Sequence, residues 1–197
     1  MREVKAGLNR CDWCGEDPAY VRYHDEEWGV PQRESQRLFE LLVLEGAQAG
    51  LSWITILRKR EGYRLVFDGF VAETLAAWPD ERLEAALRST QIVRNRLKVL
   101  SVRQNALAIM DLQKAGATLS DYLWEFIDHQ PLVNQWLSHN EVPAQTDLSI
   151  RISKDMKKRG FTFVGPTIIY AFMQATGMVN DHVVSCFRHR ECMETQH

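Results

Sequence analysis

Apolar residues recur at the three- to four-residue spacing of a helix along most of this chain, most clearly over residues 35–60. In the first half of this stretch, Leu38, Leu41 and Leu42 share one helical face with Glu45. A carboxylate on an apolar face requires a partner or a use, because an unpaired buried charge is costly. We therefore expect Glu45 to point into the protein.

The second half of the stretch begins at a corner that contains Gly50 and Leu51. Glycine lets another backbone or a ligand approach closely at such a corner. Ser52 is a candidate N-cap for the next helix, and Trp53 lies on the inner face of that helix. An inward carboxylate, a corner leucine and an inward tryptophan lie close together in the sequence, which predicts a pocket.

The remaining apolar patterns are helical as well, and no stretch alternates with the two-residue period of a strand. One long helix is expected to end at Gly116 and to bury a stripe of Leu97, Leu100 and Leu107. Ser120 is a candidate cap of the helix that follows.

The end of the chain predicts one more short helix, capped by Asp181 over residues 182–187, and a polar tail beyond it. Gly62 and Gly69 are expected to bracket a short segment after the central pair of helices. These patterns together predict an all-α protein with one domain over residues 1–197, in which residues 1–10 and 188–197 are flexible tails.

Composition narrows the class of protein. The 197 residues suffice for one substantial core. The net charge of −2 does not indicate nucleic-acid binding by the chain as a whole, so such binding requires a local basic patch. No apolar run approaches the ~18 residues of a membrane helix and no signal peptide opens the chain, which predicts a cytoplasmic protein. Its four cysteines are then expected to be metal ligands or buried thiols rather than disulfides.

Cysteine and histidine residues occur near both ends of the chain. His182 and Cys186 are four residues apart and would share one face of a helix, which is a metal-ligand spacing. Cys11 and His24 would complete a set of two thiolates and two imidazoles, typical of structural zinc. In one alternative, Cys186 is a buried thiol and His182 a core histidine. In another, Cys11 and Cys14 bind metal as a CxxC pair.

Aromatic residues are concentrated in the N-terminal segment and at the corner: Trp13, Tyr20, Tyr23, Trp28 and Trp53. They are either ordinary core residues or the lining of a pocket for a flat ligand. The inward Glu45 favours the pocket, because it adds one acceptor to an apolar surface. A flat, electron-poor ring with an exocyclic amine would stack on the rings and donate to the carboxylate. A positive charge on that ring would add cation–π attraction.

Three groups of cations are candidate phosphate contacts in this slightly acidic chain, at residues 58–60, 94–98 and 154–159. Each group by itself is more often a solvated surface, and the three together favour a surface for a polyanion.

Several long stretches resemble the bacterial 3-methyladenine DNA glycosylase I family: CDWCGEDPAYVRYHDEEWGVP, LFELLVLEGAQAGLSWITILRKRE, IVRNRLK, KKRGFTFVGPTIIYAFMQATGMVNDHVV and the Cys186 that follows. The resemblance runs from about Cys11 to Cys186. It implies the helix–hairpin–helix DNA glycosylase fold, with the two terminal segments joined by a structural zinc site.

The resemblance also implies roles for individual residues. The zinc ligands would be Cys11, His24, His182 and Cys186, which selects Cys11 over Cys14. The catalytic residues would be Glu45, Tyr23 and Trp53, and Trp13, Tyr20 and Trp28 would complete the base-binding pocket. The DNA contacts would be Gly50 and Leu51 at the corner and Arg94, Asn95, Arg96 and Lys98 at the hairpin. Gln91 departs from the family, which usually has glycine there.

The implied activity is hydrolytic excision of N3-methyladenine from double-stranded alkylated DNA, which leaves an abasic site and free 3-methyladenine. Related enzymes use an aspartate near the hairpin, and neither this chain nor the resembling family has one assigned to that role. The enzyme would act as a monomer on bases already activated by alkylation. Two alternatives are a zinc-stabilised DNA-binding protein without catalysis and a glycosylase of shifted specificity.

Overall fold

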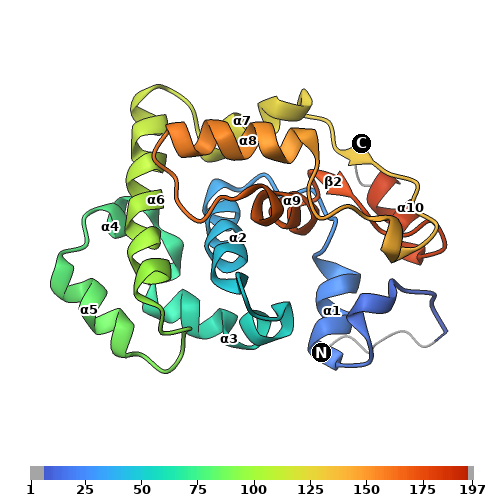
Figure 1. Cartoon of the computed structure of the whole chain (residues 1–197), viewed down its shortest axis with the longest axis horizontal. Helices are drawn as coiled ribbons and strands as arrows, with labels where there is room; N and C mark the ends of the chain where they lie inside the picture. Colours follow the sequence, from blue (N-terminus) through green and yellow to red (C-terminus); the bar gives the residue numbers. More distant parts are fainter. Residues whose placement is uncertain (1–6, 195–197) are drawn as a thin grey trace.

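Helix α2 (Ser35–Gln48) runs through the middle of the molecule in the computed structural model, which describes residues 7–194 (Figure 1). Ten of its 14 residues are buried, because it packs against α3, α6, α7 and α9. The α-helices around it are α1 (Pro18–Glu26), α3 (Trp53–Val66), α4 (Ala72–Ala76), α5 (Asp80–Arg88), α6 (Arg96–Lys114), α7 (Leu119–Trp124), α8 (Asp147–Lys158), α9 (Pro166–Ala175) and α10 (Phe187–Glu194).

The prediction of a helical protein is confirmed for the described residues, with one small addition. Strands β1 (Leu132–Val133) and β2 (Val179–Asn180) form a parallel pair in which Leu132 aligns with Val179 and Val133 with Asn180. Short 3₁₀ segments complete the described secondary structure: Asp12–Cys14, Asp68–Phe70, Glu125–Ile127 and His139–Glu141. Two-residue strands are too short to leave a periodic signal in the sequence.

The first and last parts of the described chain lie together at one end of the molecule (Figure 1). The backbone N–H of Phe187 donates to the carbonyl oxygen of Asn9 at 3.0 Å, and the Arg10 guanidinium pairs with Asp25 at 2.8 Å. The predicted tail beyond residue 187 is wrong as far as residue 194, since α10 occupies it. Residues 7–10 of the predicted N-terminal tail are described and include the Asn9 and Arg10 contacts, whereas residues 1–6 and 195–197 lie outside the described residues.

Helix α6 buries a different face from the predicted one. Leu97 and Leu107 are 67% and 41% exposed. The buried stripe instead contains Val99, Val102, Ala106, Ile109 and Leu112. Val99 lies two residues after Leu97, which is about 200° around a helix, so Leu97 faces away from the core. Leu100, the third predicted residue, is half-buried and packs against the core.

Two predicted helix caps are also wrong. Thr118 caps α7, and its side chain and that of Asp121 form a capping box, whereas the Ser120 N–H donates to Ser35 Oγ. Asp181 caps no helix, because residues 181–186 form a turn before α10.

Asp181 is instead the centre of a buried hydrogen-bond cluster. Its carboxylate accepts from Asn134 and Trp136 of the segment after β1, at 2.6 and 2.8 Å. It also accepts from Tyr170 and Gln174 of α9, at 2.6 and 2.8 Å. Four donors compensate the loss of water around this carboxylate, and they fix α9 against the C-terminal segment.

Candidate functional site

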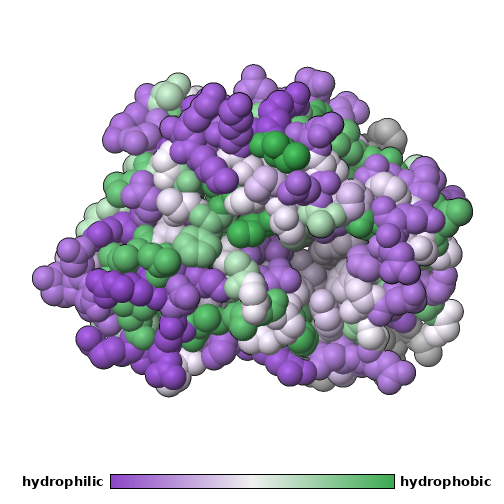
Figure 2. Space-filling model, in the orientation of Figure 1, coloured by the Kyte–Doolittle hydropathy of each residue, from purple (hydrophilic) through white to green (hydrophobic). Residues whose placement is uncertain are grey.

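A cavity of about 220 Å³ opens between α1, α2, α3 and α9. In the orientation of Figure 1, the surface is hollowed between α1 and α9 (Figure 2). The structure brings all six predicted pocket residues to its wall: Trp13, Tyr20, Tyr23, Trp28, Glu45 and Trp53.

The aromatic residues form two contacting groups around the cavity. The ring centroids of Tyr23 and Trp53 are 5.3 Å apart. Trp13 lies 5.1 Å from Tyr20 and 4.9 Å from Trp28, with rings inclined by 57° and 67°. The indole N–H groups of Trp13 and Trp53 are buried and have no hydrogen-bond partner among the described residues. The wall therefore offers flat ring faces and two indole donors without an acceptor.

Glu45 supplies a carboxylate to this wall. It is only 4% exposed, and among residues 7–194 it has no hydrogen-bond or ion-pair partner. Burial raises the pKa of Glu45 to about 8, because desolvation disfavours the charged form. A structural ion pair, which would lower the pKa, is therefore not the role of Glu45 in this structure.

Four further residues line the cavity and were not predicted: Gln48, His139, Ala171 and Gln174. Gln48 lies three residues after Glu45 on the same helical face, a spacing from which it could have been found. Nothing local in the sequence indicates the others, because α9 and the segment around His139 reach the cavity through tertiary packing. Since Gln174 Nε2 donates to Asp181 at 2.8 Å, its amide oxygen remains as an acceptor.

The cations at residues 58–60 are engaged within the protein. Arg58 pairs with Asp17 at 2.6 Å and Arg60 with Glu27 at 2.6 Å. The Lys59 ammonium donates to the Thr90 carbonyl oxygen at 2.8 Å. The sequence offers these three cations as candidate phosphate contacts, and in the structure each of them has a partner within the protein.

The corner between α2 and α3 stands exposed near the cavity. Gly50 has φ +78° and open space around it, and Leu51 is 42% exposed. Ser52 occupies the N-cap position of α3, although its hydroxyl contacts Thr55 Oγ1 at 2.8 Å instead of a backbone N–H.

The predicted hairpin residues lie in the loop 89–95 and the first turn of α6. Arg94 is exposed and has no charged partner among the described residues, whereas Arg96 pairs with Glu84 at 2.5 Å. Asn95 caps α6 by accepting from the Lys98 N–H at 3.1 Å. The Lys98 ammonium donates to the carbonyl oxygens of Ala47 and Ala49.

Gly62 lies inside α3 and does not end a segment as predicted. A Cβ atom there would come within 2.5 Å of the Gln91 carbonyl oxygen, so glycine is required for the loop 89–95 to lie against the helix. The Tyr63 hydroxyl accepts from the Val93 N–H at 3.2 Å in the same contact. The loop is therefore held on α3 at a fixed position.

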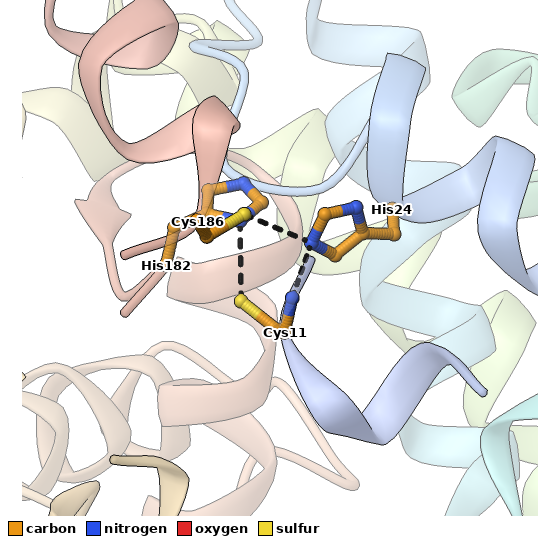
Figure 3. A group of neighbouring side chains, drawn as sticks. All are labelled: Cys11, His24, His182 and Cys186. Carbon is orange, nitrogen blue, oxygen red and sulfur yellow. Dashed lines mark hydrogen bonds between the residues drawn. The ribbon is translucent and has the colours of Figure 1, made fainter. Parts of the chain in front are cut away.

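The four predicted metal ligands converge although they come from opposite ends of the chain (Figure 3). Their ligand atoms lie within 4.8 Å of one another, and all four residues are buried. Cys186 Sγ is 3.4 Å from His24 Nε2 and 3.6 Å from His182 Nδ1, and Cys11 Sγ is 3.5 Å from His182 Nδ1. This cluster could hold a metal ion.

The predicted reason for the spacing of His182 and Cys186 is wrong, because they lie in a turn and not on a helix.

The second ring nitrogen of each histidine in the cluster has a contact that orients the imidazole. His24 Nδ1 is 2.8 Å from Asp25 Oδ1, and His182 Nε2 is 3.0 Å from the Trp28 carbonyl oxygen. Cys14 is buried outside the cluster.

Two solved structures have this fold over nearly the whole chain. The first is a crystal structure of 3-methyladenine DNA glycosylase I, with a TM-score of 0.89 and 48% identity, which covers 91% of this chain and 98% of that one. The second is a variant of 3-methyladenine DNA glycosylase I in complex with 3-methyladenine, with a TM-score of 0.88 and 32% identity, which covers 91% of this chain and 97% of that one.

Sequence comparison identifies the family. DNA-3-methyladenine glycosylase 1 of Escherichia coli (strain K12) is 48% identical over 179 residues, or 91% of this chain and 96% of that protein. The family model described as methyladenine glycosylase matches residues 13–189. The chain belongs to the methyladenine glycosylase family, which confirms the family inferred from the sequence. Among the described residues, no helix is both long and apolar enough to cross a membrane.

Proposed function

We propose that this protein hydrolyses the N-glycosidic bond of N3-methyladenine in double-stranded DNA and releases the free base. The observation that carries the proposal is Glu45, which lies in an aromatic cavity and has no partner among the residues that the structure describes. We propose that the protein acts as a monomer, with an aromatic wall that surrounds Glu45. The relative solved with 3-methyladenine supports the choice of base.

The chemistry follows from the charge on the substrate. Alkylation at N3 makes the base cationic and a good leaving group without protonation. The base must leave the stack to be reached, which costs a few kcal/mol. In the cavity, Tyr23 and Trp53 would stack on it and attract its charge.

Glu45 would accept from the amine of the base. Its own ionisation becomes favourable when a cation replaces water beside it, because an opposite charge lowers the pKa of a carboxyl group. Water attacks the sugar as the bond breaks. Since no aspartate near the loop 89–95 is assigned to activate that water, the reaction is limited to bases that leave readily.

Calorimetry with free bases tests the pocket assignment. Titration with 3-methyladenine should show binding at one site per chain, and adenine should bind at least tenfold more weakly. Equal binding of the two bases would favour a glycosylase of shifted specificity, and binding of neither would remove the pocket from the mechanism.

We further propose that the four-residue cluster binds structural zinc. The Zn–S and Zn–N bond lengths of about 2.3 and 2.0–2.1 Å put tetrahedral ligand atoms about 3.3–3.8 Å apart. The three measured sulfur–nitrogen distances of 3.4–3.6 Å fit that range. When bound, the metal would join Cys11 and α1 to the segment before α10.

On DNA, we propose that Leu51 enters the duplex where the base has left, and that the loop 89–95 with the first turn of α6 acts as the hairpin that contacts phosphates. The exposure of Leu51 and the lack of a charged partner for Arg94 within residues 7–194 support these roles. Both belong to the N-terminal half of the chain, on either side of α3.

Arg94→Ala should weaken binding to duplex DNA of any sequence and flatten its salt dependence. Loss of one phosphate contact reduces the slope of log K against log salt by about 0.9. Fluorescence anisotropy at several salt concentrations measures this slope. Arg190→Ala is the matched control, because Arg190 is 86% exposed on α10 and pairs with Glu194. An unchanged slope in Arg94→Ala would place the phosphate contacts elsewhere.

Gly62→Ala should displace the loop 89–95 from α3 and lower duplex affinity several-fold, because the added Cβ meets a backbone oxygen. Affinity for free 3-methyladenine should not change. Gly165→Ala is the control, since a Cβ at Gly165 meets nothing within 4 Å and its φ of −61° suits alanine. Wild-type duplex affinity in Gly62→Ala would show that the position of the loop is unimportant.

A further inference from the structure

Lys98 makes an unusual connection between two distant parts of the chain. It lies in the first turn of α6, yet its ammonium donates to the carbonyl oxygens of Ala47 at 2.8 Å and Ala49 at 2.6 Å. Ala47 is in the last turn of α2, and Ala49 is its C-cap. The side chain therefore crosses from the start of one helix to the end of another.

This connection has a clear electrostatic basis. A cation in the first turn of α6 opposes the dipole of its own helix, whereas a cation at the C-terminal end of α2 is stabilised by unpaired carbonyl groups. Helix α2 has no basic residue in its last turn. Lys98 supplies that missing charge from α6, and burial of its ammonium lowers its pKa.

The connection joins the two parts of the protein that the proposed function assigns to DNA. Ala49 immediately precedes Gly50 and the exposed Leu51. On the other side, the Lys98 N–H donates to Asn95, the last residue of the loop 89–95. One residue thus contacts both the corner and the loop.

We propose that Lys98 is a positioning residue that fixes the Leu51 corner relative to the phosphate-binding loop, so that binding of the DNA backbone directs Leu51 into the duplex. This inference rests on the proposed roles of the loop and of Leu51. It replaces the sequence-based expectation that Lys98 itself binds phosphate, because both of its short hydrogen bonds go to backbone oxygens of the protein.

Lys98→Met tests the proposal, since methionine keeps an unbranched apolar chain and loses the charge. Excision of 3-methyladenine from duplex DNA, measured in single turnovers with enzyme in excess, should slow at least tenfold. Excision from single-stranded DNA, where no duplex has to be opened, should slow less than threefold. The affinity for free 3-methyladenine and the salt slope of duplex binding should match those of the wild type.

The control is Lys114→Met at the other end of α6, where Lys114 is exposed and pairs with Asp111. It should match the wild type in all four measurements. Lys98→Gln, which keeps a donor, serves as a second variant if Lys98→Met does not fold by circular dichroism. It should show the same duplex-specific defect to a smaller degree.

A double-mutant cycle with Leu51→Ala shows whether Lys98 acts through the corner. If it does, adding Lys98→Met to Leu51→Ala should slow duplex excision by less than threefold, because coupled residues are not additive. Fully additive effects would overturn the proposal. A salt slope reduced by about 0.9 in Lys98→Met would also overturn it, because that change identifies a phosphate contact. Failure of the wild type to release any base would instead contradict the proposed function.

Discussion

Replacement of Glu45 by glutamine is expected to slow release of 3-methyladenine from DNA ten- to a hundredfold while the protein stays folded. Glutamine is nearly isosteric and keeps one acceptor oxygen, but it cannot carry the charge that a cationic base requires. A hydrogen bond to a charged group contributes roughly 1.5–3 kcal/mol, which corresponds to that range of rates. Single-turnover excision and calorimetry with free 3-methyladenine measure the two effects.

The pH dependence of kcat/KM, measured for the wild type and for Glu45→Gln, tests whether the charge of Glu45 is required. Since the pKa of Glu45 is raised to about 8, the ionised form increases as pH rises through that value. We expect kcat/KM of the wild type to rise between about pH 6 and pH 9, because kcat/KM follows the ionisation of the free enzyme. The Glu45→Gln variant should lack this rise.

The stability of the wild-type protein should fall with rising pH, whereas its kcat/KM rises. A carboxyl group whose pKa is raised on folding stabilises the protein fully below its unfolded pKa of about 4.5, and that contribution is lost as pH rises through about 8. The Glu45→Gln variant has no such loss. The difference between its melting temperature and that of the wild type should therefore shift in favour of the variant between pH 5 and pH 9. A destabilised variant with unchanged base affinity would show that Glu45 is structural.

Loss of the metal site is expected to have the largest effect on stability. Structural zinc contributes about 10–16 kcal/mol in zinc-finger peptides that have no other core. This chain also has a large apolar core, so we expect loss of the zinc to cost less, about 3–5 kcal/mol. For a chain of this length, that corresponds to a fall in melting temperature of about 6–20 °C. Cys186→Ser should show this fall and lose the zinc that elemental analysis finds at one per chain in the wild type.

The main defect of Cys186→Ser should be its lower melting temperature, and its activity per folded molecule should be less affected, although the cluster adjoins the pocket. The Trp28 ring lies 4.6 Å from His182, and the Trp13 ring lies 5.4 Å from His24. Cys14→Ser is the matched control, because Cys14 is buried outside the cluster and its loss should leave the metal content unchanged. A metal-free wild-type protein of normal stability would refute the zinc site.

The features that the sequence predicts correctly depend on local geometry. Glu45 and Trp53 are recognised because the period of their own helices turns them inward. Gly116 follows the end of α6 with a positive φ, as expected for a glycine that ends a helix.

The errors arise where long-range contacts decide the structure. Asp181 has the composition of a helix cap, but four donors from other segments bury it. Leu97 and Leu107 are apolar and yet exposed, and no periodicity distinguishes an exposed leucine from a core one. His182 and Cys186 are correctly grouped by spacing, although a turn and not a helix brings them together.

Excision of a cationic alkylated base from DNA is the reaction proposed for the Glu45 cavity. Chromatography of the bases released from methylated duplex DNA, with Glu45→Gln run in parallel, measures this reaction. The wild-type protein should release 3-methyladenine and leave an equal number of abasic sites, and the variant should do so ten- to a hundredfold more slowly. Release of no base by the folded wild-type protein, or equal release by both proteins, would contradict the claim.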